Sequence, residues 1–149
     1  MAYITAADLS RRLGATLYAR LTDRENGTTA NAAVAETIVA EAESEANSYL
    51  AARYATPVSL SVHPELADVL ARRVLDLAEY GAWRGSPFVS DIPARVKALY
   101  LEACAWFSRV AAGAPLPASS APAATELVDD TPVYRAQPRT FTAKELDGL

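Results

Sequence analysis

A change of character after residue 113 constrains the fold of this chain more than any other feature. In residues 114–125, ten of the twelve positions are alanine, proline or serine, a composition typical of a linker without a core of its own. Residues 1–113 carry apolar side chains at helical spacing, whereas residues 126–149 are polar with scattered apolar positions. The sequence therefore predicts a helical body (1–113), a linker (114–125) and an extended C-terminal arm (126–149).

The first helix of the body is expected to begin at Thr5. Thr5 and Asp8 have the spacing of a capping box, in which the hydroxyl accepts an amide hydrogen and the carboxylate lies near the positive end of the helix. Gly14 has the position of a left-handed C-cap. A second short helical segment is expected over residues 15–21.

A long and acidic helix is expected over residues 31–54, capped by Thr28 or Thr29. No lysine or arginine occurs between Arg24 and Arg53, so the helix is distinctly acidic. Glu36 and Glu43 are expected to point away from its apolar stripe. That stripe consists of Ile38, Ala42, Ala46, Tyr49 and Leu50.

Two further helices complete a predicted all-α bundle of about four helices. One runs from Pro64 to about Trp83, with Asp68, Arg72 and Asp76 four residues apart on its outer face. Asp91 is expected to cap the last helix, which ends near Gly113. Its stripe is Val96, Leu99, Tyr100, Ala103, Phe107 and Val110. Between the helix expected over 31–54 and the helix that begins at Pro64, residues 58–62 alternate in polarity and allow a short extended piece.

Charge and composition exclude several classes of protein. The net charge of −4 argues against a general nucleic-acid binder, which normally carries a basic patch. A single cysteine permits no intramolecular disulfide, and no run of 18 apolar residues is present to span a membrane. The first residues lack a basic segment followed by an apolar run, so no signal peptide is expected.

Residues able to support catalysis or metal binding are sparse, and we expect no enzyme activity, no metal and no cofactor. With one histidine (His63) and one cysteine (Cys104), a zinc site of the usual kind cannot be built. His63 is interpreted as a loop residue, and Cys104 as a small residue at the edge of the core. The segment 23–27 is interpreted as a polar turn rather than a calcium loop.

Arg73 falls within the apolar stripe of the helix that begins at Pro64. An unpaired buried guanidinium is costly, so Arg73 is expected either to extend to the edge of the core or to pair with a carboxylate. That carboxylate would belong to the same domain or to a neighbouring subunit, and the sequence leaves these alternatives open. Glu41 and Glu45 are four residues apart, which is more typical of a solvated acidic face than of an acid–base pair.

Several short motifs together resemble the Mu-like bacteriophage neck protein family. They cover the helical body and the last dozen residues, in the expected order and spacing. The motifs are Tyr3-x-Thr5-Ala6-x-Asp8-Leu9-x-x-Arg12-x-Gly14, Leu21-Thr22-Asp23-Arg24, Ser48-Tyr49-Leu50-Ala51-Ala52-Arg53-Tyr54 with Pro57, and Pro138-Arg139-Thr140-Phe141-Thr142-x-x-x-Leu146.

The resemblance implies a head-to-tail connector (adaptor), a structural protein of the virion neck that is assembled in the bacterial cytoplasm. Such proteins form a homo-oligomeric ring, typically of twelve copies, which extends the DNA channel beneath the portal protein and joins the capsid to a tail-side neck or stopper protein. Contact with genomic DNA is then passive. The alternative from the residues is a small helical DNA-binding or packaging-accessory protein, for which Arg11, Arg12, Arg20 and Arg24 give slight support.

Two sets of site residues follow from this interpretation as hypotheses. The first is an interface with the portal or with another subunit, formed by Arg73 and by Tyr134, Arg139, Phe141 and Leu146 of the arm, because aromatic and arginine side chains dominate such contacts. The second is a channel lining formed by Glu36, Glu41, Glu43 and Glu45, since an acidic wall repels the phosphate backbone.

Overall fold

The computed structural model describes residues 2–62 and 64–113, and every regular element within them is helical. The elements, in order, are α1 (Ala6–Leu13), α2 (Ala15–Thr22), α3 (Ala32–Leu50), the 3-10 turn η1 (Pro64–Leu66), α4 (Ala67–Gly85) and α5 (Ala94–Ala111). The predicted all-α class is confirmed. The described residues end at 113, where the predicted body ends. The expected linker and arm lie outside them.

Helix α1 begins as the sequence predicts. The Thr5 hydroxyl oxygen accepts a hydrogen bond from the Asp8 amide at 3.3 Å, and the Asp8 carboxylate accepts one from the Thr5 amide at 2.9 Å. Gly14 separates α1 from α2 with a φ of 78°, which favours glycine, but its ψ of 155° lies outside the left-handed helical region. The chain therefore turns sharply at one residue instead of through a loop.

The other helix boundaries correct three expectations. Asn31, not Thr28 or Thr29, caps α3, because its side-chain oxygen accepts from the Val34 amide at 3.2 Å. Helix α3 also ends at Leu50, four residues before the predicted end. Helix α5 follows Pro93 without a side-chain cap, so the expected role of Asp91 is wrong.

The segment between α3 and η1 contains turns rather than the extended piece that alternation allowed over residues 58–62. Tyr3, near the N-terminus, connects this segment to α3 through hydrogen bonds. The Tyr3 hydroxyl accepts a hydrogen bond from the Val58 amide at 2.7 Å and donates one to the Asn47 side chain at 2.8 Å. Burial raises the pKa of this hydroxyl, which therefore stays protonated and able to donate.

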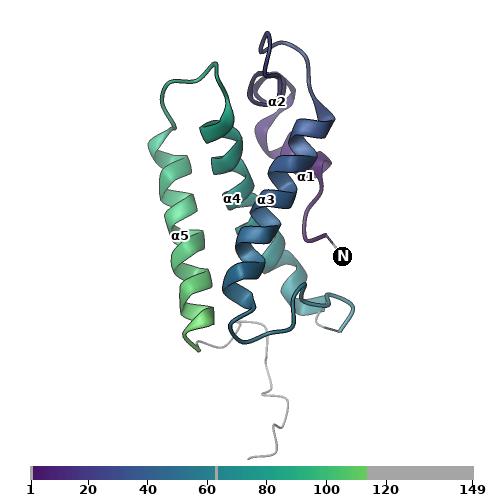
Figure 1. Ribbon diagram of the computed structural model, residues 1–149, viewed down its shortest axis with the longest axis vertical. Coiled ribbons are helices and arrows are strands. Elements are labelled where there is room, and N and C mark those ends of the chain that lie inside the picture. Colours follow the sequence, from purple (N-terminus) through teal and green to yellow (C-terminus); the bar gives the residue numbers. More distant parts are fainter. Residues whose placement is uncertain (1, 63, 114–149) are drawn as a thin grey trace, which may run out of the picture. The chain divides into compact units, whose positions relative to one another are not determined.

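The three long helices α3, α4 and α5 pack against one another, and α1 and α2 pack against α3 and α4 (Figure 1). Helix α5, drawn in green, forms one edge of the bundle and contacts α3 and α4 but neither of the first two helices. One side of α5 is therefore left without a neighbour inside the described body.

Several alanines of the long helices are completely buried. Five of them have no exposed surface, and their small side chains let the helix backbones approach closely: Ala35, Ala46, Ala78, Ala82 and Ala103. The largest fully buried side chain is Phe107 of α5, which stacks on Tyr49 of α3 with ring centroids 6.0 Å apart. Each larger apolar residue such as Phe107 buries more area than an alanine does. None of the described helices is long and apolar enough to cross a membrane.

Candidate functional site

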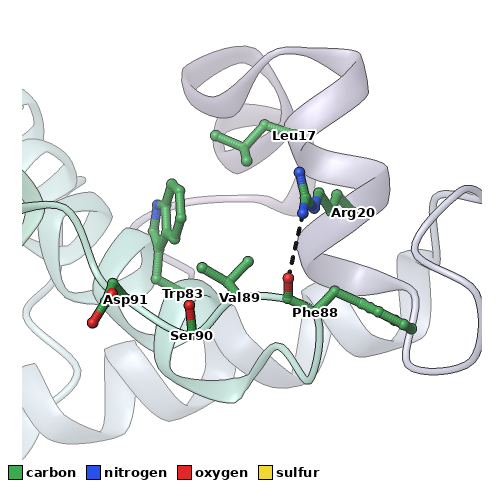
Figure 2. Close-up of a pocket in the computed structure, with 7 residues that line it drawn as sticks. All are labelled: Leu17, Arg20, Trp83, Phe88, Val89, Ser90 and Asp91. Atoms are coloured by element: carbon green, nitrogen blue, oxygen red, sulfur yellow. Dashed lines mark hydrogen bonds between the residues drawn. The ribbon is translucent and has the colours of Figure 1, made fainter.

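A groove lies where α2 meets the loop between α4 and α5 (Figure 2). Leu17 and Arg20 come from α2, Trp83 from the last turns of α4, and Phe88 and Val89 from the loop, around a hollow of about 200 Å³. Phe88 is 36% exposed although its ring lies against Gly27, whose φ of 69° and missing Cβ make room for it. Figure 2 shows this ring directed away from the hollow, so its exposed surface lies beside the groove, whereas Trp83 lines the hollow itself.

One hydrogen-bond donor in this groove makes a long bond, and a second makes none within the described residues. The Arg20 guanidinium donates to the Phe88 carbonyl at 3.4 Å, close to the limit for such a bond (Figure 2). The indole N–H of Trp83 is buried and has no hydrogen-bond partner among the described residues. Tryptophan, arginine and phenylalanine are residue types that are enriched where proteins bind one another.

A cluster of buried charges joins α1 to α4. The Arg12 guanidinium donates from Nε to Glu79 and from Nη2 to Asp76, both at 2.9 Å, so one planar fork serves two carboxylates. The Asp76 side chain is 1% exposed. The predicted placement of Asp76 on the outer face of its helix is therefore wrong.

Arg73 lies at the edge of the same cluster. Its Nη1 is 3.7 Å from Asp76 and 3.7 Å from Glu102 of α5, and 22% of the side chain is exposed. Of the alternatives that the sequence left open, the structure shows pairing with carboxylates inside the domain. A role for Arg73 between subunits stays a hypothesis without direct support from these contacts.

The four glutamates of α3 divide into two pairs. Glu36 and Glu41 are exposed, as a channel lining would require. Glu43 instead accepts hydrogen bonds from the amides of Tyr3 and Ile4, so it does not point away from the body as expected. Glu45 accepts a hydrogen bond from the Tyr100 hydroxyl at 3.2 Å.

Cys104 lies beside Glu45, with its sulfur 4.0 Å from the carboxylate. Burial raises the pKa of this thiol, so it stays protonated and poorly nucleophilic at neutral pH. Its half-buried position agrees with the predicted edge of the core. His63 lies outside the described residues.

The loop between α2 and α3 is organised by Asp23. One carboxylate oxygen accepts from the amides of Glu25 and Asn26, and the other accepts from those of Thr28 and Thr29, at 2.9–3.2 Å. The segment is thus the polar turn that the sequence predicts, with its carboxylate fully engaged by backbone. Among the described residues, no group of three or more histidine, cysteine, aspartate or glutamate side chains is arranged to hold a metal ion.

These four amides hold the pKa of Asp23 well below its usual range. Because the folded pKa is depressed, the charged carboxylate stabilises the fold above the unfolded pKa of about 3.9, and this contribution declines as pH falls toward the folded pKa. We expect Asp23→Asn to lower the thermal unfolding midpoint at pH 7 and to differ less from the parent protein at pH 3. A gap that is equal or larger at pH 3 would contradict the assignment.

The arm residues Tyr134, Arg139, Phe141 and Leu146 lie outside the described residues, so their predicted contacts are neither supported nor opposed by the geometry. The groove around Trp83 was not expected from the sequence. The available signal was the pair of aromatic residues, Trp83 and Phe88, on either side of the Gly85-Ser86-Pro87 break, where neither residue belongs to an apolar stripe.

Comparison with known proteins agrees with an assembly protein of phage origin. No curated protein matches the chain. A family model described as Bacteriophage Mu, Gp36 matches residues 3–131, which is most of the chain. The chain therefore belongs to the Bacteriophage Mu Gp36 family and is a structural or morphogenesis protein of a Mu-like phage.

Proposed function

We propose that this chain is a head-to-tail connector (adaptor) and has no catalytic activity. A ring of copies lies beneath the portal of the phage, extends the DNA channel and joins the capsid to the tail-side neck proteins. The observation that carries the proposal is the family match over residues 3–131. The copy number of the ring, its contact with the portal and its position in the neck are all parts of this proposal.

The described body has the properties that a ring subunit needs. Arg12 joins α1 to α4 through two buried carboxylates, and Tyr3 fastens the first residues to α3 and to the following loop. Such internal bonds hold the helices in one arrangement before any partner binds, which reduces the entropy lost on assembly. The Trp83 groove and the exposed Phe88 ring beside it then supply surface for a neighbour.

The channel lining in this proposal is reduced to Glu36 and Glu41. These two side chains are exposed, whereas Glu43 and Glu45 are bound within the body. A ring that repeats two carboxylates per copy around its bore would repel the DNA backbone and keep it from adhering. The wall would thus favour sliding of DNA over binding.

The alternative, a small DNA-binding or packaging-accessory protein, loses one of the four arginines that favoured it. Of the four N-terminal arginines, Arg12 is bound to two buried carboxylates and Arg11 pairs with Asp8 at 3.4 Å. Arg24 lies over Gly85, and Arg20 contacts the Phe88 carbonyl. Buried carboxylates therefore withdraw Arg12 from any contact with phosphates, whereas Arg11, Arg20 and Arg24 stay exposed.

The test is a pull-down of the full chain by the intact portal ring of the same phage. One variant removes the arm anchors (Tyr134→Ala, Arg139→Ala, Phe141→Ala and Leu146→Ala), and a second changes the groove (Arg20→Glu with Phe88→Ala). We expect the parent chain to bind and the arm variant to lose binding. Binding by the arm variant but not the groove variant would move the portal contact to the helical body.

Failure of the parent chain to bind an intact portal would sink the connector proposal. A filter-binding assay at moderate salt then tests the alternative, because an acidic connector is expected to show no measurable affinity for duplex DNA.

A further inference from the structure

The outer side of α5 is an unpartnered helix face with a regular pattern. Exposed residues recur at alternating steps of four and three, which is the spacing of a helix-packing seam. They are Ala94, Ala98, Leu101, Ala105, Ser108 and Ala112, and we call them the α5 seam. Five of the six are alanine or serine, and Leu101 stands near the centre with 64% of its surface exposed.

The charges beside the α5 seam are mostly positive. Arg95, Lys97 and Arg109 are exposed, and the one carboxylate on this helix, Glu102, lies 3.7 Å from Arg73. The seam is therefore an apolar strip with a basic border. A second α5 packed on it symmetrically would bring the same basic side chains together, which costs free energy through like-charge repulsion.

The outer side of α3 has the opposite charge and a similar texture. Ala33, Thr37, Ala40 and Ser44 are exposed along it, so its surface is smooth. Glu36 and Glu41 border this strip, and the helix contains no basic residue. We call this strip the α3 face.

We infer that the α5 seam of one copy packs on the α3 face of the next copy, with Leu101 inserted between the small residues and the basic border opposite Glu36 and Glu41. Small side chains on both helices permit a close approach, and the charges are complementary only in this pairing. The two faces belong to different helices of one subunit, so the contact is head-to-tail, the kind of interface that closes into rings. The inference rests on the proposed ring and names the surfaces that form it.

This pairing has a consequence for the bore of the ring. If Glu36 and Glu41 lie at the subunit boundary, basic residues of the neighbour neutralise part of their charge. The same two carboxylates then serve as the border of a packing seam as well as the acidic wall. Replacing Glu36 and Glu41 by neutral residues is therefore expected to weaken ring assembly more than it impairs the passage of DNA.

The chain offers a direct chemical test, because it contains only two lysines, Lys97 and Lys144. In a Lys144→Arg background, heavy-isotope and ordinary chains are mixed and treated with a carbodiimide, which joins an amine to a carboxylate in contact with it. The reaction is run on the free chain at high concentration and on the chain bound to the portal ring. Mass spectrometry then identifies peptides that join one heavy and one ordinary chain.

We expect mixed-isotope products between Lys97 and Glu36 or Glu41 in at least one of the two preparations. Lys97→Arg keeps the charge but removes the amine, so it should abolish the product while leaving assembly intact. Leu101→Arg should reduce the product at least tenfold with an unchanged unfolding midpoint, because the residue is exposed in the single chain. Added salt should also reduce the product.

Two results would overturn the inference. One is a mixed-isotope product between Lys97 and Glu102, which indicates two α5 helices face to face. The other is the absence of any Lys97 product between chains both free and on the portal. In either case a positive portal pull-down would leave the connector proposal standing, so the two failures are distinguishable.

Discussion

Replacing Arg12 by alanine is expected to lower the free energy of unfolding by about 3–5 kcal/mol, the typical cost of leaving buried charges without their partner. Two carboxylates depend on this guanidinium, and Asp76 is 1% exposed while the Glu79 side chain is 11% exposed. After the substitution, Arg73 at 3.7 Å is the remaining cation near Asp76. Urea unfolding followed by circular dichroism measures the change.

Arg11 provides the matched control on the same helix. Its side chain is 79% exposed and pairs with Asp8 in solvent, so Arg11→Ala should cost about 0–1 kcal/mol. Arg12→Lys should fall between the two, because a single ammonium cannot reproduce the planar fork that reaches both carboxylates. A loss for Arg12→Ala no larger than that for Arg11→Ala would refute the role assigned to the cluster.

Phe107→Ala should be as damaging, with a loss of about 3–5 kcal/mol from lost burial and the cavity left behind. The side chain has no exposed surface, stacks on Tyr49 and meets the edge of Trp106 with centroids 5.0 Å apart. Calorimetric melting measures the effect, and Phe107→Leu should be milder because it fills part of the volume.

The control for Phe107 is Leu101, which lies on the same helix and is 64% exposed. Leu101→Ala should change the free energy of unfolding by less than about 0.5 kcal/mol, as surface substitutions usually do. If Leu101→Ala destabilised the single chain as much as Phe107→Ala, the two sides of α5 would be wrongly assigned. The comparison therefore tests both the core and the free face from which the ring contact is inferred.

Features that depend on neighbours in sequence could be predicted well. The capping box of Thr5 and Asp8, the polar turn after Asp23 and the apolar stripe that contains Phe107 all follow from spacing within a few residues. These rules describe backbone geometry that the chain adopts locally. They identified the helices and the all-α class.

Features that depend on distant partners could not be predicted. Asp76 has the spacing of a surface ion pair with Arg72, yet its partner Arg12 comes from 64 residues earlier in the chain. Glu43 has the helical angle of a solvent-facing residue but accepts hydrogen bonds from the first amides of the chain. No rule of local periodicity contains that information, because the pairing is decided by how the helices pack.

The candidate surfaces follow the same division. The exposure of Glu36 and Glu41 agrees with helical periodicity, whereas the Trp83 groove arises only when α2 is placed against the loop after α4. Asn31 rather than Thr28 or Thr29 caps α3 because the helix begins at Ala32, which places the Val34 amide within reach of the Asn31 side chain.

The Asp23 carboxylate also determines how fast that loop exchanges its hydrogens with water. Amides in an exposed turn normally exchange through frequent local opening, well before those of neighbouring helices. The amides of Glu25, Asn26, Thr28 and Thr29 are instead bound by one carboxylate, two on each oxygen. In deuterated water this loop should therefore retain its protons about as long as the first turn of α3.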